Sequence, residues 1–333
     1  MSENLQEQAC WLLLTYESGF PSRVISEIVV TWCQQLNRSL QEFFVAGPQV
    51  WKDTCHLGDS TIEKLEQARA KLAGQAFLVE QLNHDHIHLL TVLDDNYPRL
   101  LKTSLKPEQT PPVLFYAGDL HILEQQTFAI IGSRNAGEES LAFTRAVSSY
   151  FAEQGANVIS GNARGVDRTA YEGATSTEGC TTVVLPHGVR KLSGVQWRAL
   201  LAKIEAGKVL LLSQFHPDAQ WVVSRAMERN KVVTGLAQIV IVAESDTQGG
   251  TWAGATGALR QNRPLYVRDT ASSSTLPGNK ALIELGGHPL PWPTEQLADV
   301  LSPLIQKSAA LRQVKDDEPS RPDQLSLFVG SGE

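Results

Sequence analysis

The sequence predicts an α/β fold in which helices cover both faces of a parallel sheet, with a small helical domain in front of it. Short apolar runs near residues 128, 157, 181, 208, 239 and 264 alternate with segments of helical periodicity. That alternation is typical of parallel strands joined by crossover helices. We therefore predict a helix-rich N-terminal domain at residues 1–110, the sheet domain at 111–304 and a flexible tail at 305–333.

The N-terminal domain has apolar residues at helical spacing, interrupted by glycine and proline. Its predicted helices span residues 8–17, 22–36, 40–44 and 60–82. The alternating residues His84, His86 and His88 are predicted to lie on one face of a short strand. Because nothing in the sequence supplies a second set of ligands, we predict no metal site there.

The net charge is -7, but the charge is unevenly distributed along the chain. Residues 1–110 have 9 Lys/Arg against 14 Asp/Glu, whereas residues 186–235 have 8 Lys/Arg against 3 Asp/Glu. Since polyanion binding requires local positive charge, we expect a nucleic-acid surface on the sheet domain. No apolar run reaches the about 18 residues of a membrane helix, so a cytoplasmic protein without a membrane partner is expected. The 4 cysteines lack metal or redox spacing.

A glycine-containing turn follows the first apolar run of the sheet domain. Gly132, Ser133 and Arg134 lie between this run and a predicted helix at residues 138–154. Backbone amides at such a turn bind anions near a helix N-terminus, and an arginine adds donors. The turn lacks the other glycines of the dinucleotide motif, and the ATP-binding motif G-x-x-x-x-G-K-[ST] is absent from the sequence. We predict a phosphate site without a nucleotide cofactor.

A second glycine-framed turn follows the next predicted strand. Its residues include Ser160, Gly161, Arg164 and Gly165. An NAD-binding fold usually has an acidic residue at the end of this strand to hold the ribose, and here the strand ends in serine and glycine. Because parallel strands align their carboxyl ends, Arg164 and Arg134 are predicted to lie on one edge of the sheet. Two arginine-bearing turns favour a polyanion, although Arg164 can instead pair with Asp167 inside its turn.

Three more segments are predicted to contact phosphate. They are Arg190 with Lys191, Arg229 with Asn230 and Lys231 late in a predicted helix at 217–234, and Gly250 with Thr251 at a helix start. Glycine amides at a helix start form an anion nest, or only a turn that needs positive φ. The cations at the helix end can also complement its dipole without any ligand. Trp221 is the best candidate in the sequence for stacking on a base, although large aromatic side chains more often belong to the core.

These segments resemble, in their order and spacing, the DprA/Smf family. The matching stretches are Asp95-Asn-Tyr-Pro98, Pro111-Pro-Val-Leu-Phe-Tyr-Ala-Gly118, Phe128-Ala-Ile-Ile-Gly-Ser-Arg134, Val158-Ile-Ser-Gly-Asn-Ala-Arg-Gly-Val-Asp167, Arg229-Asn-Lys-Val-Val-Thr-Gly-Leu-Ala237, Ile241-Val-Ala-Glu-Ser-Asp-Thr-Gln-Gly-Gly-Thr251 and Pro277-Gly-Asn279. The resemblance covers roughly residues 90–290. It implies an extended Rossmann-like domain that binds single-stranded DNA, helps to load a RecA-type recombinase and forms a homodimer, with no catalytic residue required. The pathway stays open between transformation (competence), repair, plasmid establishment and phage defence.

The polar, proline-broken tract after residue 305 is not expected to form a core. Near its end Gln324, Leu325, Leu327 and Phe328 belong to the stretch Gln-Leu-Ser-Leu-Phe. This stretch resembles the pentapeptide by which bacterial DNA polymerases and repair proteins dock on the sliding clamp. Apolar anchors on a flexible tether suit a preformed groove, so we predict the clamp as a further partner.

Two other functions are compatible with the sequence. Glu244 near Gly249-Gly250-Thr251 resembles the catalytic segment of phosphoribohydrolases, which cleave a base from a nucleoside monophosphate on a related fold. Release of free base from nucleotides would identify such an enzyme. The other alternative is an adaptor that is tethered to the clamp and acts in DNA repair or phage defence.

Overall fold

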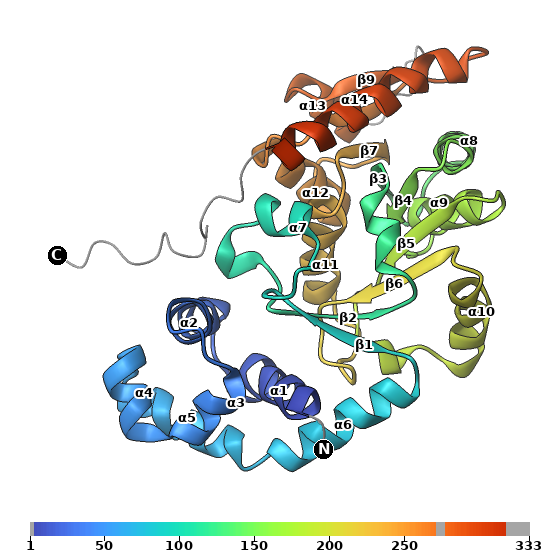
Figure 1. Ribbon diagram of the computed structural model, residues 1–333. Coiled ribbons are helices and arrows are strands. Elements are labelled where there is room, and N and C mark those ends of the chain that lie inside the picture. The colour runs from blue at the N-terminus through green and yellow to red at the C-terminus, as the bar shows by residue number, and fades with distance from the viewer. Residues whose placement is uncertain (1–2, 271–276, 318–333) are drawn as a thin grey trace. The chain divides into compact units, whose positions relative to one another are not determined.

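Figure 1 shows the computed structural model of the 333-residue chain, which describes residues 3–270 and 277–317. The described chain divides into two compact units. The first consists of the residues up to Tyr97 together with Lys106–Phe115, and the second of Pro98–Leu105 together with Tyr116 and the described residues that follow it.

The first unit is mainly helical. Its elements are α1 (Glu3–Leu12), the π-helical η1 (Leu13–Glu17), α2 (Ser22–Ile28), the π-helical η2 (Val29–Gln35), α3 (Leu40–Ala46), α4 (Pro48–Cys55), α5 (Asp59–Arg69), α6 (Leu72–His84), β1 (His88–Thr91) and the 3₁₀ turn η3 (Pro107–Gln109). Its centre is aromatic, because the buried Phe43 ring lies 5.4 Å from the Trp32 ring and 5.3 Å from the Trp51 ring.

Two expectations for this unit are wrong in detail, and one helix was not predicted. The helix predicted at residues 60–82 is two helices, since the chain turns at Ala70 and Lys71 between α5 and α6. Helix α4 was missed, and it starts at Pro48 after Gly47 with a φ of 81°. The three histidines do not share a strand face, because His84 ends α6, His88 starts β1 and His86 has a φ of 56° between them.

The second unit alternates strands and helices along the chain. Its first elements are α7 (Arg99–Ser104) and β2 (Val113–Ala117), and β2 begins in the first unit. The elements that follow are η4 (Leu120–Glu124), β3 (Thr127–Gly132), α8 (Glu138–Glu153), β4 (Asn157–Ser160), α9 (Val166–Thr175), β5 (Cys180–Val184), η5 (Val189–Lys191), α10 (Gly194–Glu205), β6 (Val209–Ser213), α11 (Val223–Gly235), β7 (Ile239–Glu244), α12 (Gly249–Arg260), β8 (Leu265–Asp269), α13 (Pro277–Glu284), β9 (His288–Pro291) and α14 (Leu297–Asp317). The strands predicted near six positions are confirmed as β3 to β8, whereas β1, β2 and β9 were missed.

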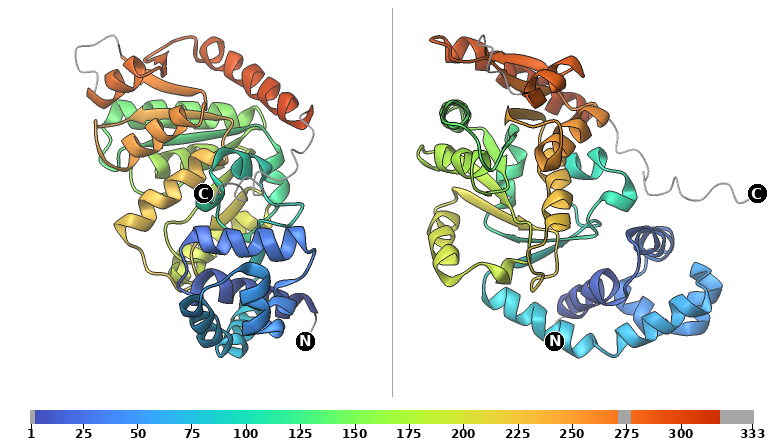
Figure 2. Two further views of the ribbon diagram at one scale, coloured as in Figure 1. Left: turned by 90° about the vertical axis from the view of Figure 1, so that its left-hand side faces the viewer. Right: turned by 180° about the vertical axis from the view of Figure 1, so that it is seen from behind.

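The strands form one nine-stranded sheet in the order β1-β2-β6-β5-β4-β3-β7-β8-β9. Neighbours from β6 through β9 pair in parallel, which confirms the predicted α/β fold. Helices α8 and α9 lie on one face and α11 and α12 on the other (Figures 1 and 2). The chain adds strands in one direction from β3 to β6 and in the other from β7 to β9, so β3 and β7 flank the switch point, where open α/β sheets bind ligands.

Helices α8 and α9 pack against the sheet through a core of buried apolar side chains. Phe128 of β3 stacks on Phe151 of α8 with ring centroids 3.9 Å apart, and both side chains are fully buried. Val147 and Val158 belong to the same cluster. Burial of each large apolar side chain stabilises the fold by about 1.5–3 kcal/mol.

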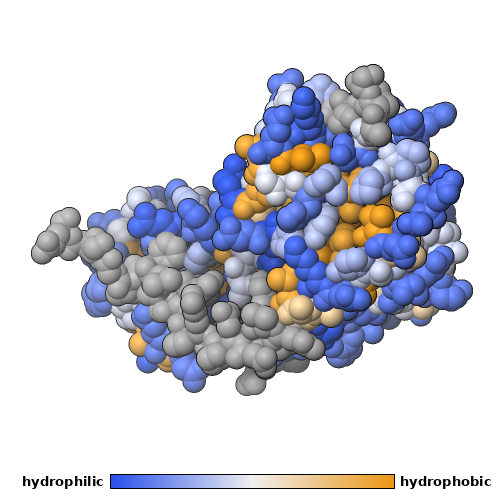
Figure 3. Space-filling view, turned by 90° about the horizontal axis from the view of Figure 1, so that it is seen from above, coloured by the Kyte–Doolittle hydropathy of each residue, from blue (hydrophilic) through white to orange (hydrophobic). Residues whose placement is uncertain are grey.

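The face of the molecule shown in Figure 3 is mostly hydrophilic and is interrupted by hydrophobic patches.

The predicted start of a tail at residue 305 is wrong, because α14 continues to Asp317. Leu301 and Leu304 are buried, and Ser308 donates a hydrogen bond of 2.6 Å to Oε1 of Gln238. Small and helix-forming residues in this stretch therefore extend the helix over the core. The clamp-like stretch at residues 324–328 lies outside the described residues. None of the described helices is both long and apolar enough to cross a bilayer.

Replacing Phe151 with alanine should lower the free energy of unfolding by about 3–5 kcal/mol, since it removes a buried ring and leaves a cavity beside Phe128. Urea unfolding followed by far-UV circular dichroism measures this loss. The matched control is Tyr150→Ala, which truncates the neighbouring, only partly buried ring. Equal losses in the two variants would contradict the assignment of Phe151 to the core.

Candidate functional site

A cavity of about 340 Å³ lies at the carboxyl ends of β3 and β7, at the switch point of the sheet. Six of the predicted site residues line it: Gly132, Arg134, Arg229, Asn230, Gly250 and Thr251. The other lining residues are Ile131, Ala163, Asp167, Val223, Ala226, Met227, Val233 and Gly249. The structure therefore brings together residues from the β3 turn, the β4 turn, α11 and the start of α12.

Two backbone amides of the turn after β3, which was predicted to bind an anion, are paired within the chain. The amide of Ser133 donates to the carbonyl of Glu244 at 2.9 Å, and the amide of Asn135 donates to Oγ of Ser133 at 3.1 Å. At the start of α8, Oε2 of Glu244 accepts from the amide of Gly137 at 3.0 Å and from Oγ of Ser140 at 2.6 Å. A carboxylate of the chain thus occupies the anion position at this helix N-terminus.

Arg134 itself faces outward from this turn. It is exposed, and its guanidinium carbon lies 5.5 Å from the centre of the Trp221 ring. Trp221 is 45% exposed, in agreement with its predicted place near the basic residues. A cation and an accessible aromatic face therefore lie side by side at the mouth of the cavity.

Two backbone amides of the turn after β4 are also paired within the chain. The Asp167 carboxylate accepts backbone hydrogen bonds from Gly161 and Ala163. Burial raises the pKa of Asp167, and the Arg229 guanidinium, whose Nη2 lies 3.7 Å from Oδ2 of Asp167, opposes that rise. The local pairing of Arg164 with Asp167 is therefore not formed, and Arg164 instead donates to Oδ1 of Asn135 at 2.6 Å.

The residues of this turn that were predicted to contact DNA through their backbone are largely buried. Ser160 and Gly161 are buried, so the expectation that they contact DNA is wrong. Gly165 has a φ of 84°, and a Cβ at this position would overlap the carbonyl oxygen of Ser133. Glycine here lets the two turns pack backbone against backbone, which keeps Arg134 and Arg164 on one edge of the sheet.

Arg229 is not the free phosphate contact that was predicted. It is only 2% exposed, and its Nη1 donates to the carbonyl of Val184 at 2.7 Å. A Cβ on Gly161 would overlap the guanidinium, so the arginine fits only over glycine. Helical spacing could have revealed this, because Arg229 lies three residues after the buried Ala226 and four before the buried Val233.

The other predicted cations lie apart from the cavity lining. Lys231 is exposed on α11. Arg190 and Lys191 are exposed too, and each lies near a carboxylate oxygen of Asp218, at 3.6 Å and 3.8 Å. Exposed ion pairs of this kind are worth about 0–1 kcal/mol, so they contribute little to the stability of the fold.

The start of α12 is a helix N-terminus that lines the cavity. Gly249 has a φ of 89°, and Gly250 and Thr251 follow it on the cavity wall. Nδ2 of Asn230 donates to the carbonyl of Gly250 at 3.2 Å, which ties this start to α11. The N-cap residue Gln248 makes no side-chain hydrogen bond to the helix, so the first amides of α12 are not capped by it.

Asn279, from the Pro-Gly-Asn stretch, supports the loop before α12. Its Oδ1 accepts from the amide of Ser245 at 2.8 Å, and its Nδ2 donates to the carbonyls of Ala243 and Arg268 at 3.2 Å and 2.9 Å. A Cβ on Gly278 would overlap the Ser245 carbonyl, so this motif has a positioning role.

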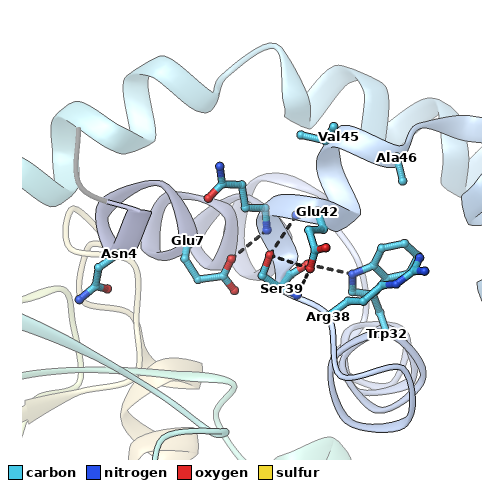
Figure 4. Close-up of a pocket in the computed structure, with 9 residues that line it drawn as sticks. Asn4, Glu7, Trp32, Arg38, Ser39, Glu42, Val45 and Ala46 are labelled. Carbon is cyan, nitrogen blue, oxygen red and sulfur yellow. Dashed lines mark hydrogen bonds between the residues drawn. The ribbon is translucent and has the colours of Figure 1, made fainter.

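A second cavity, of about 830 Å³, lies in the first unit (Figure 4). Oε1 and Oε2 of Glu7 accept from the amides of Leu40 and Gln41 at 3.0 Å and 2.8 Å and so cap α3. Arg38 lies over the Trp32 ring, 5.2 Å from its centre. The predicted site residues do not line this cavity, and the Glu7 carboxylate serves to cap a helix.

Replacing Arg229 with alanine should lower the free energy of unfolding by about 3–5 kcal/mol, because it leaves the Asp167 carboxylate buried without its cation. The control Lys231→Ala removes an exposed cation two residues away and should change stability by about 0.5 kcal/mol or less. Chemical denaturation measures both values.

A double variant separates the ion pair from simple packing. If the pair is responsible, adding Asp167→Asn to Arg229→Ala should restore part of the lost stability, since it removes the unpaired charge. Fully additive losses would show that Arg229 stabilises the fold through its other contacts alone.

Comparison with known proteins identifies the relatives of this chain. The chain is similar to the protein Smf of Synechocystis sp., with 28% identity over 264 residues. This match covers 78% of this chain and 64% of that protein. The chain is also 30% identical over 190 residues to the protein Smf of Escherichia coli, and this match covers 57% of this chain and 49% of that protein. The chain thus spans 64% of the length of the first relative and about half of the length of the second.

Solved structures show the same fold. DNA processing protein A of Streptococcus pneumoniae superposes with a TM-score of 0.65 at 22% identity, over 84% of this chain and 94% of that chain. DNA processing protein A of Helicobacter pylori superposes with a TM-score of 0.56 at 25% identity, over 66% of this chain and 96% of that chain. The model of the family described as DNA recombination-mediator protein A matches residues 88–301. Since this match spans more than half of the sequence, the chain belongs to the DNA recombination-mediator protein A family.

Proposed function

We propose that the protein binds single-stranded DNA at the carboxyl edge of the sheet in its second unit and acts in DNA recombination. The main supporting observation is the placement of exposed Arg134 against exposed Trp221 at the switch point between β3 and β7. A single-stranded DNA binding mode is described for the similar Helicobacter pylori protein.

Two kinds of group at the cavity mouth suit phosphate. Arg134 offers a guanidinium in solvent, which can bind a phosphate through two parallel hydrogen bonds. The N-terminal amides of α12, whose first residues also line the cavity, add a partial positive charge. Arg164, close to the same turn, extends the positive edge. Binding through these groups is expected to be sensitive to salt and tolerant of sequence.

Trp221 favours single strands over duplexes. Its exposed face can stack on a base only when that base is not already stacked and paired in a helix. The neighbouring apolar residues Val222 and Val223 are 40% and 63% exposed and extend this surface. An unpaired strand thus gains both stacking and phosphate contacts here.

The enzymatic alternative is disfavoured by the position of Glu244. Its carboxylate holds the start of α8 through Gly137 and Ser140 and so serves a structural role. Loading of a RecA-type recombinase and homodimer formation are further parts of the proposal, and family membership supports them.

Replacing Arg134 with alanine should weaken binding of a fluorescent oligothymidylate about tenfold and reduce the salt slope by about one, as expected for one lost phosphate contact. Fluorescence anisotropy titrations at several salt concentrations measure both effects. Arg145→Ala, which removes an exposed arginine from α8, is the matched control. The same affinity in both variants would refute the assignment of Arg134 to the DNA site.

The clamp-like stretch at residues 324–328 is proposed as a separate partner-binding segment. Deleting residues 320–333 should leave DNA affinity intact and abolish binding to the purified sliding clamp. Leu327→Ala combined with Phe328→Ala should reproduce the loss, since paired apolar anchors dominate such short-peptide binding. Retention of the clamp by the double variant in a pull-down would refute the motif.

A further inference from the structure

We infer that a bound single strand continues past the carboxyl edge of the sheet onto the surface between α9 and α10, where Arg168 and Lys203 contact further phosphates. The inference rests on the proposed function and adds a second contact region to it, separate from the cavity. We name this region, which comprises Arg168, Tyr171, Lys203 and Lys208, the flank cluster. Its place in the fold, its charge and its connection to the edge support the inference.

The flank cluster lies on the face of the sheet opposite to α11 and α12, which line the cavity. The chain adds strands in one direction from β3 to β6, so the crossover helices α8, α9 and α10 cover one face. Figure 1 shows these three helices on the same side of the sheet. Arg168 and Tyr171 belong to α9, and Lys203 belongs to α10. A strand that leaves the cavity over the carboxyl edge meets this face.

Two cations share one aromatic ring in the flank cluster. The guanidinium carbon of Arg168 lies 5.2 Å from the centre of the Tyr171 ring, and Nζ of Lys203 lies 5.0 Å from it. Each contact of this kind is worth about 0.5–1 kcal/mol at an exposed site. The two cations also repel each other, and a phosphate that contacts both offsets this repulsion.

Lys203 has no carboxylate partner in an ion pair among the described residues. Burial lowers the pKa of Lys203, and the neighbouring cations Arg168 and Lys208 lower it further. The Glu172 carboxylate opposes this shift, but it is already paired with Nε of Arg168 at 2.7 Å. A phosphate bound here stabilises the charged form of Lys203, so the cluster gains from an added anion.

Arg168 connects the flank cluster to the carboxyl edge. Its Nη1 donates to Oδ1 of Asn162 in the turn after β4 at 3.3 Å. Arg164, in the same turn, donates to Asn135 in the turn after β3. Both arginines are exposed, and Nη2 of Arg168 makes no hydrogen bond to the described part of the chain. Exposed cations thus lead from the β3 turn across the β4 turn to α9.

The flank cluster suits phosphates rather than bases. Tyr171 is only 5% exposed beneath the two cations, so its ring is not available for stacking. Contacts of guanidinium and ammonium groups with the backbone of the strand carry no sequence information. They raise affinity only for strands that are long enough to reach them, because each contact neutralises one more phosphate.

The test compares the affinities of a short and a long oligothymidylate, of about 6 and about 20 nucleotides. In Arg168→Gln combined with Lys203→Gln, the long strand should bind about tenfold more weakly. Its salt slope should fall by about 1.4, as expected for two lost phosphate contacts on a single strand. The affinity for the short strand should change by less than about twofold, because this strand is held at the edge. Glutamine removes the charge and keeps part of the stem that covers Tyr171.

The matched control is Lys64→Gln combined with Arg260→Gln, which removes two exposed cations from α5 and α12. It should leave both affinities and the salt slope unchanged. The charge-preserving pair Arg168→Lys with Lys203→Arg should retain most of the affinity for the long strand, since it keeps both cations in the flank cluster.

A second measurement uses the unaltered protein. An amine-reactive reagent, with mass spectrometry as the readout, should label Lys203 in the free protein, because its lowered pKa leaves more of the neutral amine. The long strand should reduce this labelling several-fold, and the short strand should not. Lys64 should be labelled equally with either strand and without DNA.

The outcomes separate the two proposals. If the glutamine pair leaves the long strand unaffected or weakens both strands equally, or if the long strand does not protect Lys203, the flank cluster is refuted as a DNA contact. An effect of Arg134→Ala on both strands then still supports DNA binding at the edge. If the unaltered protein binds neither strand, the proposed function and this inference both fail.

Discussion

The second unit depends on one buried ion pair, between Arg229 of α11 and Asp167 of α9. Removing these charges from water costs several kcal/mol per ion, and the cost is offset only when the remaining donors and acceptors find partners. Here the guanidinium also donates to Val184 at the end of β5, and the carboxylate accepts from the turn after β4. The pair thus joins a helix on one face of the sheet to turns at its carboxyl edge.

This pair also constrains the residues around it. The guanidinium occupies the space over Gly161 that a side chain would need. Asn230, next to Arg229, accepts from its Nε at 3.1 Å and donates to Gly250. The position of the α12 start is therefore coupled to a charge inside the core, and residues far apart in the sequence have to match one another at this site.

Internal carboxylates explain which positive groups remain for a ligand. Glu244 occupies the N-terminus of α8, and Asp167 occupies the amides of the β4 turn. Each glycine turn therefore has an acceptor from within the chain. The positive potential at the edge then comes from Arg134, Arg164 and the start of α12, in a protein whose net charge is -7. Such a local field, rather than the total charge, governs attraction of a polyanion.

The sequence alone determined the order of the strands β3 to β8, because hydrophobic periodicity is a local property of the chain. It also placed Arg134 and Gly250 at strand and helix ends, and parallel strands bring such ends to one edge. The short strands β1, β2 and β9 and the helical course of residues 305–317 were not predicted, since contacts with distant residues stabilise them.

Only the tertiary structure decided which groups at that edge are free to meet a ligand. Arg134 and Arg229 are both arginines in family motifs, yet one is exposed over Trp221 and the other is buried against Asp167. The physical reason is that accessibility and pairing depend on neighbours from other elements, which sequence spacing does not specify. The acceptors that fill the glycine turns, Glu244 and Asp167, became apparent only once the sheet brought them to those turns.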